Sequence, residues 1–146
     1  MENKHSKLHC IIIMSALMMF SCAENRTAIL ETPFVTVVKL ESAEQCLAFD
    51  EAMQYIDVIQ VYSKRGAENP MEDWKSFIKF QHSLGRDKKF TNTFKYFDYD
   101  IEETITSNSA VVCFKEKDIN SPIKKIIYGL EKRQNKWVVI SIDYLK

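Results

Sequence analysis

The residues that could carry acid–base chemistry are few, and no motif brings them together. General acid–base catalysis needs a base that keeps its function in an apolar pocket, and a donor that holds the developing oxyanion. His82 could be such a base, and Asp57, Tyr62, Tyr128 and Asp143 carry groups of the right kind. Their spacing does not select them as a set. We therefore expect His82 at the rim of the fold, Asp57 on the polar face of a helix and Asp143 facing solvent.

The sequence lacks the motifs of the better-known catalytic classes. It contains no phosphate-binding loop, nucleophile elbow, CxxC pair or metalloprotease helix. His5 and His9 lie within the first 21 residues, so His82 is the only histidine in the rest of the chain and cannot build a histidine-based metal cluster. We expect no catalytic residues, no metal and no cofactor.

Composition points to one ordinary globular domain. The chain has 146 residues, 20 basic residues balance 20 acidic ones, and 46% of the residues are hydrophobic. A neutral chain without a basic stripe gives no reason to expect nucleic-acid binding, and this hydrophobic content is too high for a disordered chain. The length fits a single domain with one core.

The first 21 residues have the layout of a secretory signal peptide. Lys4 and Lys7 precede an apolar run of eleven residues, Cys10 to Phe20, which is followed by small residues. As a helix this run would span only about 16 Å, half of a hydrocarbon core of roughly 30 Å. The segment therefore predicts export and not a transmembrane helix.

The end of this segment, Met19-Phe20-Ser21-Cys22, resembles the lipobox of bacterial lipoproteins, in which a cysteine follows a small residue after an apolar stretch. The resemblance implies that Cys22 is lipidated and that the protein is anchored in the cell envelope. The outer membrane is expected, because Ala23 stands where an Asp would resemble an inner-membrane retention signal. Ordinary cleavage after Ala23 is the alternative, and it would release a soluble secreted or periplasmic protein.

Two further cysteines, Cys46 and Cys113, would meet an oxidising compartment after export. A disulfide between them is one alternative. Buried free thiols are the other, since both residues lie on apolar faces of elements that we expect to pack together.

Helices are expected in the first half of the domain. Residues 22–31 are polar and aperiodic, which predicts a flexible tether before a domain at 32–146. Thr32 and Pro33 favour a helix start, and the apolar spacing of residues 34–47 predicts the helix itself. A strand is the alternative there, because residues 36–38 are β-branched.

Two more helices are expected before the sheet. Asp50 predicts the cap of a second helix that runs to Ser63. Asn69, Pro70 and Glu72 form a capping-box pattern at the start of a third helix, which is expected to stop at Gly85.

Beyond Gly85 the apolar period changes to alternation. Four strands are expected at Phe90–Thr106, Ser109–Lys117, Ile123–Arg133 and Lys136–Leu145. Short polar joints between them predict an antiparallel meander and hence an α+β fold. Apolar residues on both faces predict that the last two strands are central or covered on both sides. Alternation along the last strand puts Ile142 on the face opposite Trp137 and Val139.

This order of elements resembles the NTF2-like, cystatin-like fold. Locally, Phe49-Asp50-Glu51-Ala52-Met53-Gln54-Tyr55-Ile56 and the closing Asn135-Lys136-Trp137 resemble small bacterial lipoproteins with an NTF2-like domain of the type labelled DUF4878. The resemblance implies three N-terminal helices packed on a curved four-stranded antiparallel sheet. The candidate residues lining a cavity between helices and sheet are Tyr62, His82, Tyr128 and Trp137.

The predicted lipid anchor, the neutral surface and the lack of a catalytic set favour a non-catalytic envelope lipoprotein whose NTF2-like domain binds a protein partner or a small apolar ligand. An immunity or antagonist protein is one alternative, and a small isomerase or hydrolase is another, because this fold hosts all of these functions. A homodimer through the outer face of the sheet is also expected, because the last strands are apolar on both faces.

Overall fold

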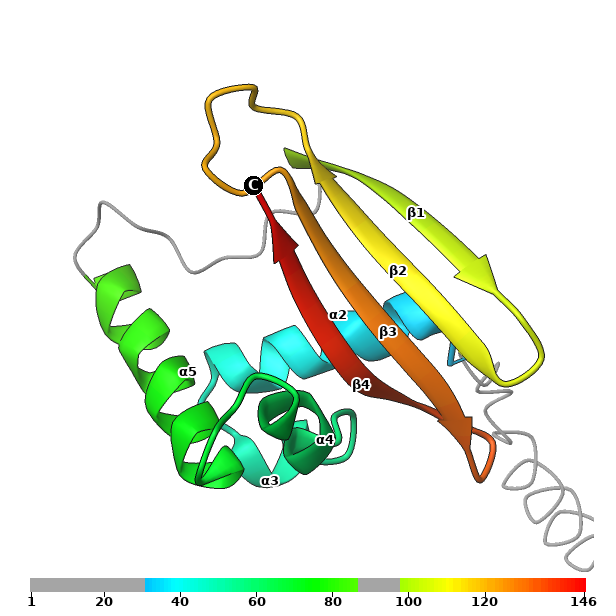
Figure 1. Ribbon diagram of the computed structural model, residues 1–146, viewed down its shortest axis with the longest axis horizontal. Helices are drawn as coiled ribbons and strands as arrows, with labels where there is room; N and C mark the ends of the chain where they lie inside the picture. The colour runs from blue at the N-terminus through cyan, green and yellow to red at the C-terminus, as the bar shows by residue number, and fades with distance from the viewer. Residues whose placement is uncertain (1–30, 87–97) are drawn as a thin grey trace, which may run out of the picture. The chain divides into compact units, whose positions relative to one another are not determined.

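The structure is a computed structural model that describes residues 31–86 and 98–146. Within them four helices precede four strands, which is the α+β order that the sequence predicts (Figure 1). The elements are α2 (Pro33–Gln45), α3 (Phe49–Ala52), α4 (Val58–Ser63), α5 (Pro70–Arg86), β1 (Tyr99–Ile105), β2 (Ser109–Glu116), β3 (Lys125–Arg133) and β4 (Lys136–Leu145).

Several predictions concern residues outside these ranges. The signal peptide, the lipidation site Cys22, the tether up to residue 30 and the first predicted strand before Asp98 all lie outside the described residues. Among the residues that are described, none of the helices combines the length and the hydropathy that a membrane crossing requires.

The sheet is an antiparallel meander with the order β1-β2-β3-β4, as predicted. β3 and β4 are joined by Gln134 and Asn135, whose φ angles of 49° and 65° lie in the left-handed region. Two such residues in a two-residue loop are typical of the turn whose twist matches that of the flanking strands. Asparagine adopts this conformation more readily than most residues, so the polar joint marks the hairpin.

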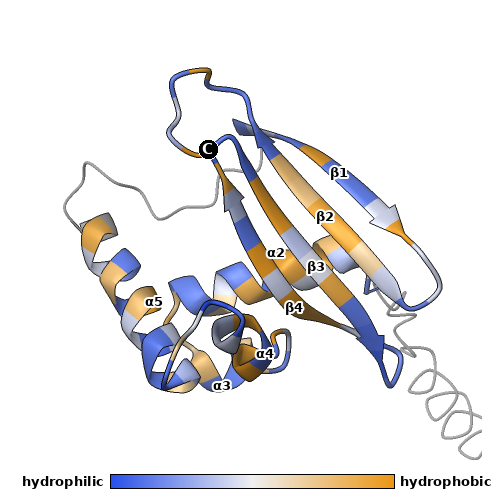
Figure 2. Ribbon diagram, viewed as in Figure 1, coloured by the Kyte–Doolittle hydropathy of each residue, from blue (hydrophilic) through white to orange (hydrophobic). Residues whose placement is uncertain are grey.

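One face of the sheet carries the core. Buried side chains alternate with more exposed ones along the strands, because successive residues of a strand point to opposite faces. The buried strand residues are Ala110, Val112 and Phe114 on β2, Ile126, Tyr128 and Leu130 on β3, and Trp137 and Val139 on β4. Figure 2 shows that β2 is mostly hydrophobic and that β1, at the edge of the sheet, is mostly hydrophilic.

A bulge in β4 changes which residues of that strand face the core. The register shifts between Gly129 and Leu130, where β4 has one residue more than β3. One inserted residue shifts the alternation by one position. Ile142 and Tyr144 therefore share the face of Tyr128. The predicted placement of Ile142 on the opposite face is wrong for this reason.

α2 begins where the sequence predicts. The Thr32 side-chain oxygen accepts a hydrogen bond from the backbone N–H of Val35 at 3.2 Å, and Pro33 occupies the first turn. Val37 and Leu40 are completely buried. A helix forms here in spite of the β-branched run because it buries this apolar stripe against the sheet, which α2 crosses (Figure 1).

The second predicted helix, Asp50 to Ser63, is replaced by two short helices, α3 and α4. Between them Ile56 forms a parallel bridge with Val139 of β4. The Val139 N–H donates to the Tyr55 carbonyl at 2.8 Å, and the Asp57 N–H donates to the Val139 carbonyl at 2.9 Å. These backbone groups would bond within the helix if it were continuous, so pairing with the strand divides it.

Asp57, and not Asp50, caps the helix that follows. Its carboxylate accepts from the Gln60 N–H at 3.0 Å and from Arg133 Nη1 at 2.7 Å. We expect Asp57→Ala to lower the free energy of unfolding by about 1 to 2 kcal/mol, the range for a lost N-cap and a surface ion pair. Asp50→Ala, at an exposed position in α3, should change it by less than about 0.5 kcal/mol. Equal losses for both variants in urea titrations would contradict this assignment.

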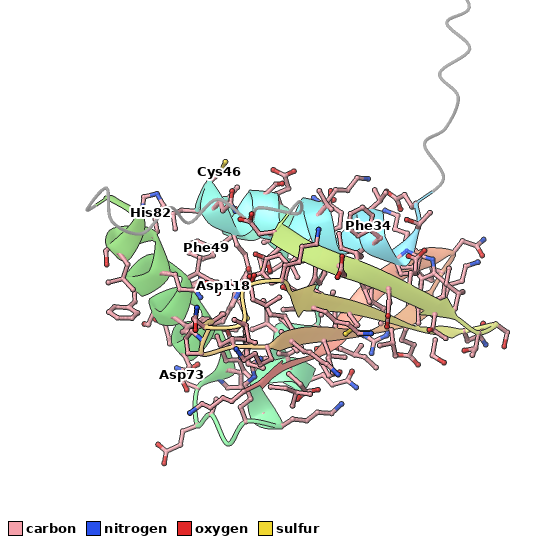
Figure 3. The ribbon with its side chains drawn as sticks, turned by 90° about the horizontal axis from the view of Figure 1, so that it is seen from above. Phe34, Cys46, Phe49, Asp73, His82 and Asp118 are labelled. Carbon is pink, nitrogen blue, oxygen red and sulfur yellow. The ribbon has the colours of Figure 1, made fainter. Side chains whose placement is uncertain are left out.

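α5 is the helix that the capping-box pattern predicts, and Trp74 anchors it. The Trp74 side chain is 0% exposed. Its ring packs edge-to-face on Phe49 of α3, with ring centroids 5.3 Å apart; Figure 3 labels Phe49 beside α5. This contact and the burial of Ile78 fix α5 beside the other helices.

The last two strands differ in position. β3 is central, as predicted, whereas β4 is at an edge, which contradicts a central position for β4, the first of the two predicted alternatives. The bridge to Ile56 pairs with the edge of β4 that β3 does not use. Val138 and Ile140 remain half-buried, which accounts for the apolar residues on the other face of this strand.

Candidate ligand-binding cavity

A cavity of about 800 Å³ lies between the helices and the inner face of the sheet. It is bounded by α2, the end of α4, α5, the connection from β2 to β3, and the parts of β3 and β4 near that connection. Figure 3 shows His82 on α5 and Asp118 in the β2–β3 connection. The described residues that line the cavity include Glu41, Glu44, Tyr62, Arg65, Phe77, His82, Glu116, Tyr128, Ile142 and Tyr144.

Glu44 is the most deeply placed acid of the cavity. Its side chain is on the inner side of α2, the residue is only 8% exposed, and one carboxyl oxygen accepts from Trp74 Nε1 at 2.7 Å. Burial, with the neighbouring Glu41 charge, raises the pKa of Glu44 to about 8, while the Trp74 hydrogen bond opposes the shift. This carboxyl group therefore keeps its proton at neutral pH.

Glu41 lies one helical turn earlier on the same face and contacts the sheet. It accepts a hydrogen bond from the Tyr128 hydroxyl at 2.5 Å. Burial raises the pKa of Glu41, and the hydrogen bond from Tyr128 opposes that shift. Tyr128 is itself almost fully buried and packs edge-to-face on Phe114, so its hydroxyl is held in place.

The two carboxyl groups form a coupled pair. Residues three apart on a helix are neighbours, and two like charges in a poorly solvated site each disfavour the ionisation of the other. At neutral pH the pair holds at least one proton, because the pKa of Glu44 is about 8. At this pH the pair can accept or donate a hydrogen bond, and a positive charge beside it would favour its full ionisation.

Aromatic side chains and one arginine form the opposite side. The Arg65 guanidinium lies 5.2 Å from the ring centroid of Tyr62 and 5.6 Å from that of Tyr144, and it donates to the Ile142 carbonyl. Burial raises the pKa of Tyr62 further above the neutral range, so this phenol stays protonated. Ile142 and Tyr144 reach the cavity because of the bulge in β4.

Three of the four predicted lining residues are found at the cavity. Tyr62 and Tyr128 line it from α4 and β3. His82, which is half-buried, lines it from α5. Asp57 and Asp143, which carry suitable groups for catalysis, are not among the lining residues. Asp57 caps α4, and Asp143 is an exposed residue of β4.

Trp137 does not line the cavity, which corrects the fourth prediction. It is the second residue of β4 and pairs with Lys132 beside the β3–β4 turn, at the opposite end of these strands from Tyr144 and Ile126. Its ring is buried in the core, with the Lys132 ammonium 5.7 Å from the ring centroid. Alternation predicts which face of the sheet Trp137 occupies, but not how far along the strand the cavity lies. Trp137 is on the inner face but at the wrong end of β4 to reach the cavity.

Cys46 and Cys113 are both free thiols. Cys46 is exposed at the end of α2, and Cys113 lies between the buried Val112 and Phe114, so it points to the outer face of β2. A disulfide between them is not formed, because one residue is on the helical side and the other faces away from it. The expectation that both lie on buried apolar faces is wrong for the same reason.

The acidic pair is the main feature that the sequence analysis does not identify. Glu41 and Glu44 follow Val37 by four and seven residues, which places them on the same face of α2 as the buried Val37 and Leu40. Two carboxylates in the apolar stripe of a helix are the signal that could have found them, since a carboxylate is rarely buried without a partner.

Neither a metal site nor a known relative helps to define the function of the cavity. In residues 31–86 and 98–146, no three histidine, cysteine, aspartate or glutamate side chains are grouped so that they could hold a metal ion. No protein-family model matches this chain, and no curated protein or solved structure matches it either.

Proposed function

We propose that this chain is a membrane-anchored lipoprotein of the bacterial envelope whose NTF2-like domain binds a small ligand without transforming it. The lipobox-like residues Met19 to Cys22 support the anchor. The NTF2-like assignment is supported by helices that precede and pack on a four-stranded antiparallel meander, with α2 across its inner face. In residues 31–86 and 98–146, four helices take the place of the three expected.

The observation that carries the binding function is the cavity. Its volume of about 800 Å³ lies in the range of small-molecule sites, which is roughly 300 to 1,000 Å³. Such sites combine apolar and aromatic surface with a few polar groups that converge on the ligand. Glu44 and Tyr62 supply such polar groups, and Phe77 and Ile142 supply apolar surface. This arrangement favours a small ligand over the alternative of a protein partner.

A ligand screen on the intact protein tests this function. The protein is extracted from membranes in mild detergent, and chemically diverse small molecules are scored by the rise in its unfolding temperature. A ligand at a hundredfold excess over its Kd should stabilise the fold by about 2.7 kcal/mol. Ile142→Trp, which fills the cavity, should abolish the rise. Ile59→Trp, on the exposed side of α4, is the matched control and should retain it. Ligands that stabilise both variants equally would place binding elsewhere.

The anchor makes a separate prediction about mass. Protein recovered from membranes should be heavier than the chain that begins at Cys22 by the mass of its acyl groups. Cys22→Ala should lose this mass and leave the membrane fraction, because several acyl chains are needed for stable anchoring. An unmodified chain that begins at Glu24 would instead indicate a soluble exported protein.

The acidic pair supports a second candidate, a small enzyme of the isomerase or hydrolase kind. A carboxyl group whose pKa is about 8 in a cavity is suited to general acid–base work near neutral pH. The screen separates the two functions. The enzyme would be favoured if the wild-type protein converts a bound ligand, or exchanges its hydrogen for deuterium from solvent, and if Glu44→Gln does neither.

A further inference from the structure

The second oxygen of each glutamate is directed to the cavity. Within the described residues, one oxygen of Glu41 bonds to Tyr128 and one of Glu44 bonds to Trp74, and neither carboxyl has another hydrogen bond. No buried side-chain oxygen or nitrogen in the described structure lacks a partner. The remaining oxygens of both carboxyls must therefore be accessible, and the cavity is the space that both residues line.

Tyr62 gives a second and independent indication of a ligand. The residue is only 7% exposed and lines the cavity. Its ring contacts Arg65, but its hydroxyl has no hydrogen-bond partner in the described part of the chain. No buried side-chain oxygen in the described structure lacks a partner, so this hydroxyl must be accessible from the cavity that Tyr62 lines, and it is available to bond to what occupies that cavity.

The charges of the lining favour a cation. Five of the described lining residues are acidic, and two, Arg65 and Lys117, are basic. Arg65 already lies over the rings of Tyr62 and Tyr144, and Lys117 pairs with Asp100 at 3.5 Å. An anionic ligand would meet like charges at the carboxyl pair. A cation would meet carboxylate oxygens, which attract positive charge.

We propose that the ligand is a small organic amine, whose ammonium group is bound between Glu41 and Glu44 and whose apolar body lies against the tyrosine rings. This inference rests on the proposed function and specifies its ligand class.

Binding of an ammonium ion must displace the proton that the pair holds. The titratable or charged groups that line the cavity with Glu44 are Glu41, Tyr62, Arg65, His82, Asp98, Tyr99, Glu116, Lys117, Asp118, Tyr128 and Tyr144. The raised pKa of Glu44 indicates that its carboxyl is mostly protonated at pH 7. A cation at hydrogen-bond distance would lower that pKa and release about one proton per amine bound. A neutral alcohol of the same shape would release none.

The test is calorimetric titration of the intact protein in detergent with benzylamine and phenethylamine, each beside the alcohol of the same skeleton. Empty micelles are the blank. Titration at pH 7 in buffers of different ionisation enthalpy counts the protons released. We expect the amines to bind at least about tenfold more tightly than the alcohols, with close to one proton released.

Glu44→Gln should weaken amine binding by about tenfold or more and remove the proton release. Glu68→Gln, at an exposed glutamate outside the cavity, is the matched control and should behave as wild type. Alcohols that bind as tightly as the amines, or amines that bind without proton release, would overturn the cation assignment. Neutral or anionic hits in the earlier screen, with no amine binding, would also overturn it and leave the proposed function intact. If no small molecule of any charge binds the cavity, both proposals fail.

Discussion

Trp74→Ala should lower the free energy of unfolding by about 5 kcal/mol, the largest loss we expect for a single substitution. Trp74 is completely buried, and truncation of such a ring costs about 3 to 5 kcal/mol through lost burial and the remaining cavity. It also removes the donor to Glu44, and an unsatisfied buried acceptor adds about 1 to 3 kcal/mol. Urea titration at pH 5 measures the loss under conditions in which the fold is expected to be most stable.

Two variants separate the contributions. Trp74→Phe keeps an aromatic ring against Phe49 but has no Nε1 donor, so we expect it to cost about 1 to 3 kcal/mol. Phe80→Ala removes a ring that is 60% exposed on the same helix and should cost no more than about 0.5 kcal/mol. If Trp74→Phe unfolded at the urea concentration of wild type, the bond to Glu44 would not contribute to stability.

The second large effect is a loss of stability as pH rises. Folding raises the pKa of Glu44 from its ordinary value of 4.5 to about 8. Between these values the unfolded chain releases a proton that the folded chain keeps, so increasing pH favours unfolding. The stability contributed by this group is fully present below pH 4.5 and is lost progressively up to pH 8. At pH 7 the loss amounts to about 3 kcal/mol.

Glu44→Gln tests this directly. An amide keeps the shape of the side chain and can still accept from Trp74, but it does not ionise in the unfolded chain. We therefore expect the variant to be more stable than wild type by about 3 kcal/mol at pH 7 and nearly equal to it at pH 4.5. Urea titrations at several pH values give the comparison, with Glu68→Gln as control. A wild-type stability that rises between pH 5 and pH 8, or a variant with the same slope as wild type, would contradict the assignment.

Local signals explain why much of the fold could be predicted. Thr32 and Pro33 fix the start of α2 through a hydrogen bond and a preset backbone angle, and both act within one helical turn. Asn135 marks the last hairpin for a similar local reason, since its φ of 65° suits the turn. The alternation along β2 and β3 predicts their buried faces because strand periodicity is a local property.

Long-range pairings account for what the sequence did not predict. The break before α4 depends on hydrogen bonds to Val139, which lies in the last strand, and no periodicity near Asp57 reports that partner. The bulge that turns Ile142 and Tyr144 toward the cavity depends on the register between two strands. Residue type alone does not single out Glu41 and Glu44 as lining residues, although their spacing from Val37 places both on the buried face of α2.

The bridge between Ile56 and Val139 also bears on self-association. An open sheet presents free backbone groups at each outer strand, and these can pair with another chain and start aggregation. On β4 the Val139 backbone groups are already bonded to Tyr55 and Asp57, so an incoming strand would have to displace them. The edge strand β1 carries the charged side chains of Asp100, Glu102 and Glu103, of which the first two pair with Lys117 and Lys115. Charged side chains on an edge strand disfavour its pairing with another chain. The two borders of the sheet are thus protected by different means, one by occupied hydrogen bonds and the other by charged side chains.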